Sequence, residues 1–178
     1  VIDVGCGSGT WARVYLESGC KVLGVDGNVV RGEQLLIPEE MFERHDLSKP
    51  FKLGRQFDLV NCLEVAEHLA KERADGFVED LCRLSPVVVF SAAIPGQGGT
   101  HHVNEQWPDY WIPKFRSQGF KLFDCLRHLI WENREVAWWY AQNILVFVRA
   151  DQAERFKELA DKCRGLPVNL VHPRAYLA

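Results

Sequence analysis

The sequence has no long hydrophobic run, no block of basic residues and no C-x-x-C pair. Its most apolar stretches, 87–90 and 144–148, are much shorter than the roughly 20 residues that a membrane span needs. The net charge is −3, and the lysines and arginines are scattered, whereas a non-specific nucleic-acid binder normally carries a basic patch. We therefore expect neither a membrane segment nor a nucleic-acid partner.

The cysteines do not have the spacing of a disulfide framework or a zinc ribbon, which would need closer pairs. All six are scattered along the chain: Cys6, Cys20, Cys62, Cys82, Cys125 and Cys163. The sequence predicts small, partly buried free thiols in a reducing compartment, with the cytoplasm as the expected location.

Short apolar runs alternate with amphipathic segments in the first half of the chain. With 178 residues, 47% hydrophobic and 25% charged, the composition indicates one globular domain. Strands are predicted over 1–4, 21–25, 41–45, 57–62 and 86–91, and helices over 10–19 and 71–84. This alternation is typical of a parallel sheet with helical crossovers.

The second half of the chain differs in composition. A loop, I-P-G-Q-G-G-T-H-H-V-N-E-Q-W-P, follows the fifth strand and is rich in glycine, proline and polar residues. We predict a helix over 109–118, two long strands over 121–131 and 137–149 joined by the turn E-N-R-E, and a last helix over 151–163. Asp151 and Glu154 have the spacing of a capping box at the start of that helix.

These elements predict an α/β fold. It is a doubly wound, mostly parallel seven-stranded sheet with helices on both faces, and its last two strands pair antiparallel because their connection is too short for a crossover. We expect the main domain to span 1–150, with a C-terminal helix and tail, 151–178, packed on it.

Three glycines at alternate positions, Gly5, Gly7 and Gly9, follow the first strand. A glycine turn at this place lets a ligand approach the backbone, because no Cβ intervenes. The spacing is G-x-G-x-G, not the G-x-G-x-x-G of dinucleotide-binding proteins, and Asp3 stands where that pattern usually has an apolar residue. Asp26 ends the second strand, where a carboxylate can accept hydrogen bonds from both ribose hydroxyls. A nucleoside ligand is indicated, and a nicotinamide-dependent oxidoreductase is the alternative.

Four motifs together are more specific than the glycine turn. D-V-G-C-G-S-G-T, G-V-D, H-D-L and F-D-L-V-N-C-L-E-V-A-E-H-L resemble, in order and over residues 1–69, those of class I S-adenosylmethionine-dependent methyltransferases. The resemblance implies S-adenosylmethionine (SAM) as cofactor and the antiparallel pair of last strands. Members usually carry one or two helices before the first strand, and none precedes it here. Either the sequence is trimmed or another element provides the cover that these helices give to the substrate.

The resemblance also implies a role for each matching position. Asp3 would order the turn and reach the methionine ammonium. The methionine and ribose would be lined by Gly5, Cys6, Gly7 and the neighbouring Gly9. Asp26 would bind the ribose hydroxyls. Gly27 and Asn28 would flank the adenine, Asp46 and Leu47 would fix its edge, and Asn61 and Leu63 would contact the cofactor beside the sulfonium. From the residues themselves, Trp11 is either a cation–π partner of the sulfonium or a core residue, and Asp46 is equally suited to an Asx turn before Ser48.

Histidines in two segments are the candidate catalytic residues. His101 and His102 lie in the polar loop that follows the fifth strand, so they are expected over the same strand ends as the glycine turn. A histidine titrates near neutrality and can accept the proton of an attacking hydroxyl or amine, and we prefer His102 for this role. His68 is placed either at the rim of the substrate cleft, on one helical face with Glu64, or in helix capping.

A metal is not expected, because the spacing H-H-x-x-E matches no strong zinc signature. The tryptophans concentrated in the second half, Trp107, Trp111, Trp131, Trp138 and Trp139, can wall a substrate pocket or pack the core. The sequence therefore predicts methyl transfer from SAM to an oxygen or nitrogen of a small molecule, with a sugar or glycan intermediate suggested by the polar, aromatic-rich loop. A catalytically inactive binding module is the other alternative. The predicted last helix carries a stripe of apolar residues, which is compatible with a homodimer.

Overall fold

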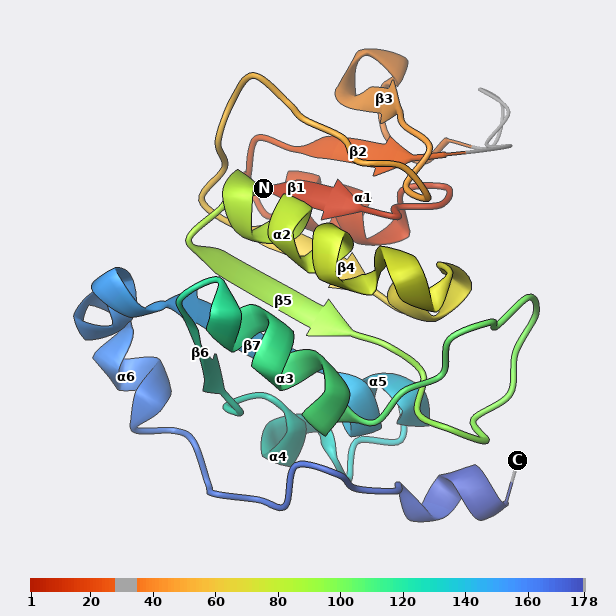
Figure 1. The fold of residues 1–178 in the computed structure, drawn as a ribbon, viewed down its shortest axis with the longest axis vertical. Helices are drawn as coiled ribbons and strands as arrows, with labels where there is room; N and C mark the ends of the chain where they lie inside the picture. Colours follow the sequence, from red (N-terminus) through yellow and green to blue (C-terminus); the bar gives the residue numbers. More distant parts are fainter. Residues whose placement is uncertain (28–34, 178) are drawn as a thin grey trace.

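The computed structural model describes residues 1–27 and 35–177, and within them seven strands form one sheet (Figure 1). The strands are β1 (Ile2–Val4), β2 (Leu23–Asp26), β3 (Phe42–Arg44), β4 (Val60–Leu63), β5 (Val87–Ser91), β6 (Phe120–Phe123) and β7 (Leu145–Arg149). Their order is β3-β2-β1-β4-β5-β7-β6. Neighbours from β3 to β5 are parallel, and β7 is antiparallel to both β5 and β6. The predicted fold class is confirmed.

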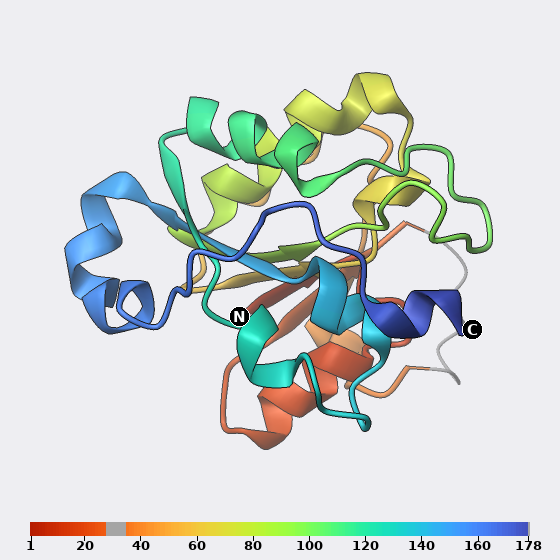
Figure 2. The same ribbon diagram turned by 90° about the horizontal axis from the view of Figure 1, so that it is seen from below.

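Helices cover both faces of the sheet (Figure 2). One face carries α2 (Ala74–Leu84) and α3 (Pro108–Ser117), and the other carries α1 (Thr10–Glu17), α4 (Arg127–Ile130) and α5 (Trp138–Asn143). The described part also contains α6 (Lys157–Ala160) and 3-10 helices at Glu39–Met41, Ala66–His68, Lys71–Arg73, Ala150–Phe156 and Pro173–Tyr176. No helix among the described residues is long and apolar enough to cross a membrane.

Aromatic side chains fill the core between β5, β7 and α3. Phe90 packs against Trp111 and Phe115, with ring centroids 5.3 and 5.2 Å apart, and Phe115 stacks on Phe147 at 3.8 Å. Trp111 is fully enclosed, so this tryptophan belongs to the core and not to a pocket wall.

The prediction of two long strands over 121–131 and 137–149 is wrong in its extent. Only β6 and β7 are strands, and the chain between them forms α4 and α5. Asp124 and Arg127, three residues apart, form an ion pair across the start of α4, and Arg127 also donates to the carbonyl oxygens of Pro167 and Val168. Tertiary partners of this kind override the strand propensity of the aromatic residues.

The last predicted helix is also different in the structure. Residues Ala150–Phe156 are a 3-10 helix, and only Lys157–Ala160 is α-helical. No capping box forms, because the Asp151 carboxylate pairs with Arg149 at 2.8 Å. Phe156 and Leu159 nevertheless pack against the buried side chains of β6 and β7. The division of the chain at residue 150 stays a prediction.

Candidate functional site

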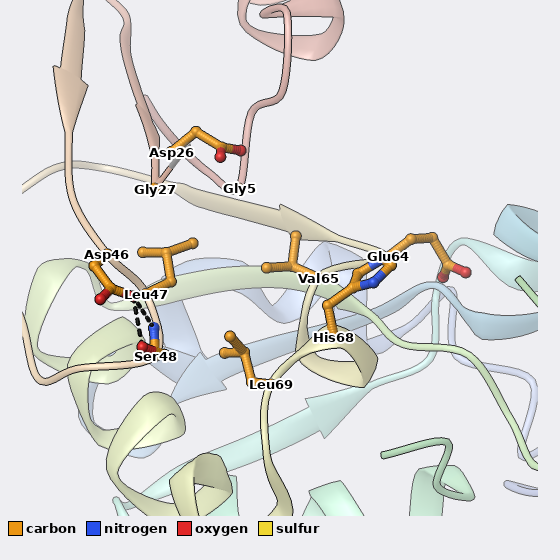
Figure 3. Close-up of a pocket in the computed structure, with 10 residues that line it drawn as sticks. All are labelled: Gly5, Asp26, Gly27, Asp46, Leu47, Ser48, Glu64, Val65, His68 and Leu69. Carbon is orange, nitrogen blue, oxygen red and sulfur yellow. Dashed lines mark hydrogen bonds between the residues drawn. The ribbon is translucent and has the colours of Figure 1, made fainter. Parts of the chain in front are cut away.

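The strand order reverses between β1 and β4, and a pocket of about 400 Å³ opens at the carboxyl ends of the strands there (Figure 3). In parallel sheets this is the usual place of ligand binding. We call it the strand-end pocket, and it is lined by Gly5, Asp26, Gly27, Asp46, Leu47, Ser48, Glu64, Val65, His68 and Leu69. It thus brings together Gly5, Asp26, Gly27, Asp46 and Leu47 of the predicted cofactor residues, and His68 of the predicted catalytic ones.

The glycine turn owes its shape to left-handed backbone conformations, with φ of 77° at Gly5, 53° at Gly7 and 87° at Gly9. The Gly5 amide donates to the Val25 carbonyl oxygen at 2.7 Å, which ties the turn to β2. The Gly7 amide donates to Asp26 Oδ2 at 2.9 Å. The carboxylate at the end of β2 therefore holds the turn and also lines the strand-end pocket.

Asp3 is buried beneath the turn, and both of its oxygens are engaged. Oδ2 accepts from the Ala12 amide at 3.0 Å, and Oδ1 accepts from Asn61 Nδ2 at 2.7 Å. Asp3 thereby joins β1, the start of α1 and β4, so its predicted role in ordering the turn has a clear structural basis. Neither Asp3 nor Asn61 lines the strand-end pocket, and a contact with a methionine ammonium stays a proposal.

Burial raises the pKa of Asp3 to about 6, although hydrogen bonds from Asn61 and Ala12 oppose the rise. The folded protein then holds this proton more tightly than the unfolded chain, so the contribution of Asp3 to stability falls as the pH rises from about 4 to about 6. We expect the unfolding free energy of the wild type, relative to an Asp3→Asn variant, to fall by about 2 kcal/mol across this window. Urea unfolding at pH 4 to 7 measures the difference, and a flat or rising difference would contradict the assignment.

Asp46 and Leu47 follow β3 at the opposite wall of the pocket from Glu64 (Figure 3). Asp46 Oδ1 accepts from the Ser48 amide at 3.0 Å, which is the Asx turn weighed in the sequence analysis. The same residue lines the pocket, so the turn and the proposed contact with an adenine edge are compatible. Gly27 packs tightly here, because a Cβ at this position would lie 3.1 Å from the His45 carbonyl oxygen.

The other predicted cofactor residues lie outside the lining of this pocket. Gly7 and Gly9 lie in the turn, the buried Cys6 thiol packs against Gly24, and Leu63 is buried at the end of β4. Trp11 is partly exposed and does not line the strand-end pocket: its ring meets Tyr140 edge-on at 5.4 Å, and its Nε1 donates to the Tyr140 hydroxyl at 3.3 Å. Asn28 lies outside the described residues.

The segment after β4 begins with a non-glycine residue in left-handed backbone. Glu64 has a φ of 55°, a conformation that in folded proteins often marks a functional position. The prediction of one helical face for Glu64 and His68 is wrong, because the 3-10 helix starts only at Ala66, yet both residues line the strand-end pocket. The Glu64 carboxylate accepts from Gln97 Nε2 at 2.8 Å and from Asn143 Nδ2 at 3.1 Å.

A second pocket of about 380 Å³ shares Glu64 with the first. We call it the tryptophan pocket, and it is lined by Glu64, Glu67, Gln97, Gly98, His102, Trp138 and Trp139. Trp138 and Trp139 thus wall a pocket, as the sequence analysis expected of some of the tryptophans. Trp107 lines a third cavity, and Trp131 packs on His172.

His102 projects from the loop after β5, and a carboxylate holds it in place. Its Nδ1 lies 2.9 Å from Glu105 Oε1, and the amides of Gly96 and Gly98 donate to the same carboxylate. His101 has a φ of 60°, is exposed and lines neither of the two pockets, so the structure favours His102 over His101. His68 lies next to His102, with ring centroids 4.8 Å apart, and burial together with this neighbour lowers the pKa of His68.

Several residues that line these pockets were not among the predicted site residues: Ser48, Glu64, Val65, Glu67, Leu69 and Gln97. Of these, Glu64 entered the predictions only as a neighbour of His68, and Ser48 only as part of a turn at Asp46. The two acids in E-V-A-E-H-L gave a usable signal, because this segment directly follows the strand beside β1. Gln97 carried no such signal, since its place depends on how the loop after β5 folds back.

The fold and the site are those of a Rossmann-like protein, with a glycine turn and a strand-end carboxylate at the switch point and an aromatic pocket beside them. A family model described as a methyltransferase domain matches residues 1–136, and the chain belongs to this family. Its methyl donor is SAM, which confirms the predicted class of enzyme and cofactor and leaves the nicotinamide alternative without support. A comparison with curated protein sequences finds no match.

Solved structures that share the fold act in different contexts. The magnesium protoporphyrin IX methyltransferase of Synechocystis PCC 6803, solved with bound SAH, is 21% identical, covers 83% of this chain and 73% of its own, and has a TM-score of 0.59. DesVI of Streptomyces venezuelae is 14% identical, covers 84% of this chain and 83% of its own, and has a TM-score of 0.62. The small RNA methyltransferase HEN1 is 18% identical over 85% of this chain and 24% of its own, with a TM-score of 0.60. At these identities the likeness shows the fold alone.

Proposed function

We propose that the chain transfers the methyl group of SAM to an oxygen or nitrogen of a small molecule bound in the tryptophan pocket. The observation that carries the proposal is the junction of the two pockets at Glu64, with His68 on one side and His102 on the other. Methyl transfer from a sulfonium needs the nucleophile, the methyl carbon and the sulfur in line, away from water. Two adjoining pockets that meet at polar side chains can hold donor and acceptor in that arrangement.

In this proposal the cofactor occupies the strand-end pocket. Asp26 accepts hydrogen bonds from the ribose hydroxyls, Gly27, Asp46 and Leu47 surround the adenine, and the glycine turn approaches the methionine part. The sulfonium then faces Glu64 and His68, at the wall that the strand-end pocket shares with the tryptophan pocket.

A sugar or a similar polyhydroxylated molecule is the acceptor that the second pocket favours. Trp138 and Trp139 offer apolar ring faces, with centroids 5.7 Å apart at 82°. Gln97, Glu64 and Glu67 supply amide and carboxylate groups for hydroxyls. Pockets of this composition bind ligands through aromatic contact and a few placed polar groups. The proposed setting is the cytoplasm, in line with the six free cysteines.

The test is a screen with isotope-labelled SAM against pooled small metabolites and against total RNA, with the product identified by mass spectrometry. We expect label in a small hydroxyl or amine compound. With that acceptor, His102→Ala should lower kcat by about 100-fold, since this side chain acts on the attacking group. Trp139→Ala should instead raise KM for the acceptor by about 10-fold and leave KM for SAM unchanged.

A matched control is His101→Asn, which removes the neighbouring imidazole at a position of positive φ that asparagine tolerates. Its kcat should stay within about three-fold of the wild type, far from the loss expected at His102. Label appearing only in RNA, or equal losses in the two histidine variants, would overturn the proposal.

A further inference from the structure

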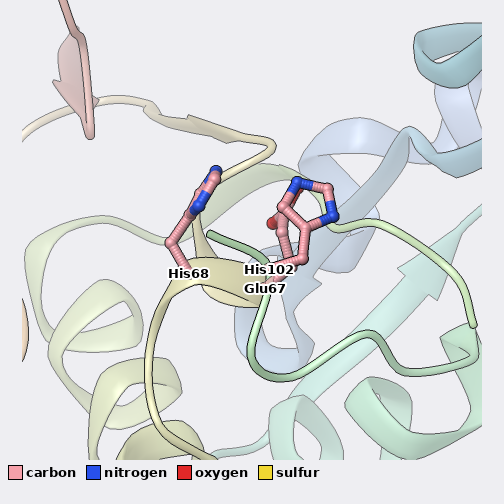
Figure 4. A group of neighbouring side chains, drawn as sticks. All are labelled: Glu67, His68 and His102. Atoms are coloured by element: carbon pink, nitrogen blue, oxygen red, sulfur yellow. The ribbon is translucent and has the colours of Figure 1, made fainter. Parts of the chain in front are cut away.

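Three side chains that offer metal-ligand atoms gather at the boundary of the two pockets. Glu67 and His68 come from the 3-10 helix Ala66–His68, and His102 comes from the loop after β5 (Figure 4). One ligand atom from each lies within 4.8 Å of the other two. Residues far apart in the chain thus converge on a space of the size that one ion needs.

The backbone holds this cluster in place. The amides of Val103 and Asn104 both donate to the Glu67 carbonyl oxygen, at 2.9 and 3.0 Å. These two bonds fix the loop onto the 3-10 helix and bring His102 beside His68. Because the ligands are positioned by backbone hydrogen bonds, little ordering would be needed on binding an ion.

The surroundings of the Glu67 carboxylate favour a bound cation. The Glu67 side chain is fully buried, and neither carboxylate oxygen has a hydrogen-bond partner of ordinary geometry, although the amides of Glu67 and Ala93 and the Glu64 carboxyl group lie near it. No lysine or arginine in the described part of the chain forms an ion pair with it. A buried carboxylate without partners is costly, and such groups are normally paired or coordinate metals.

His102 has the second contact that metal-binding histidines usually show. Glu105 engages its Nδ1, which leaves Nε2 as the ligand atom. The Glu105 carboxylate is held in turn by the amides of Gly96 and Gly98, at 2.8 and 2.9 Å. A histidine whose one ring nitrogen contacts a carboxylate, while the other faces the metal position, is the usual arrangement that orients an imidazole toward a metal.

We propose that Glu67, His68 and His102 bind one divalent first-row transition-metal ion, with Glu105 orienting His102. Two imidazoles and one carboxylate favour zinc, manganese, iron or cobalt over magnesium and calcium, which prefer oxygen ligands. The pattern H-H-x-x-E contains only His101, His102 and Glu105, so it did not predict a metal, whereas the fold supplies Glu67 and His68 in place of His101.

Three protein ligands leave coordination positions open toward the tryptophan pocket, which Glu67 and His102 both line. A hydroxyl of the acceptor bound to the ion would be more acidic and would pass its proton to water. Its oxygen would then form a bond to the methyl carbon while the bond from that carbon to the SAM sulfur breaks and SAH leaves. With the ion bound, His102 serves as a ligand and not as a base. This role in the reaction rests on the proposed function, whereas binding of the ion does not.

Titration of tag-free, chelator-treated protein with Co²⁺ tests the site, followed by visible absorption and by calorimetry. We expect one equivalent to bind with d–d bands and without thiolate-to-cobalt charge transfer, and Zn²⁺ to displace it. Glu67→Gln and His102→Ala should each weaken binding by at least about 100-fold, and Glu105→Gln by about 10-fold. His101→Asn, which removes the adjacent exposed histidine, should leave binding unchanged.

Absence of saturable Co²⁺ and Zn²⁺ binding by folded wild-type protein would overturn the proposal without any variant. Binding that survives in both Glu67→Gln and His102→Ala would do the same, because the ion would then lie elsewhere. Circular dichroism and SAH binding report whether each variant is folded. A protein that binds Co²⁺ at this site but transfers no methyl group to a small molecule would refute the proposed function and leave the metal site standing.

Discussion

Replacing Asp26 by alanine should weaken the binding of SAM and of S-adenosylhomocysteine by about 100-fold. In our proposal its carboxylate accepts hydrogen bonds from the ribose hydroxyls, and it already accepts one from the Gly7 amide at 2.9 Å. The alanine variant would lose the ribose contacts and loosen the turn that the methionine part approaches. Calorimetric titration with both ligands measures the effect, since it needs no acceptor.

The variant Asp26→Asn separates the two roles. Asparagine keeps an oxygen that can accept from the Gly7 amide, but it has no charge and one acceptor fewer for the ribose. We expect it to bind SAM about 10-fold more weakly than the wild type. Asp58→Ala, at the other end of β4 beside a different cavity, should bind SAM normally. Full affinity in Asp26→Asn would limit Asp26 to holding the turn, and full affinity in Asp26→Ala would remove Asp26 from the site.

Replacing Gly5 by alanine should destabilise the fold by about 3 kcal/mol. Its φ of 77° is strained for alanine, and a Cβ would lie 2.3 Å from Val65 Cγ2 and 2.7 Å from Val65 Cγ1. Val65 is buried, and as a β-branched residue it has few side-chain rotamers with which to make room. Urea unfolding followed by circular dichroism gives the loss of stability.

Gly19 offers a matched control for the strain alone. Its φ is 83°, but no atom lies within 4 Å of a Cβ built there, so Gly19→Ala should cost only about 1 kcal/mol. The excess in Gly5→Ala measures the collision with Val65, and in the double variant Gly5→Ala with Val65→Ala this excess should shrink. Equal losses in the two single glycine variants would show that the turn tolerates a side chain at position 5.

The first half of the chain was predicted well because its signals are local. The alternation of apolar runs with amphipathic segments indicated β1 to β5 and the parallel sheet, and the ends of β2 and β4 differ from the predicted ones by one to three residues. Gly5 and Asp26 meet at one pocket because the carboxyl ends of neighbouring parallel strands lie at the same edge of the sheet. A short turn and two strand ends suffice to place them.

The second half was predicted poorly between β6 and β7. Trp138, Trp139 and Tyr140 have strand propensity, yet they begin α5. This turn of helix lets Gln142 donate to Gln97 at 3.2 Å and Asn143 to Glu64 at 3.1 Å. Such bonds join residues far apart in the chain, so no local sequence pattern predicts them. Tertiary contacts of this kind outweigh secondary-structure propensities, which are less than about 1 kcal/mol per residue.

Local sequence patterns were enough to predict the class of fold, the order of the motifs that follow the parallel strands and the position of the glycine turn relative to Asp3 and Asp26. Each of these depends on residues next to the end of a strand. The three-dimensional arrangement was needed to show which histidine faces a pocket, that the Glu67 side chain is fully buried, and that Glu67, His68 and His102 converge. The reason is that burial and convergence are set by how the loop after β5 folds back onto the segment after β4. Two backbone hydrogen bonds to Glu67 hold that arrangement, and they leave no trace in the spacing of the residues.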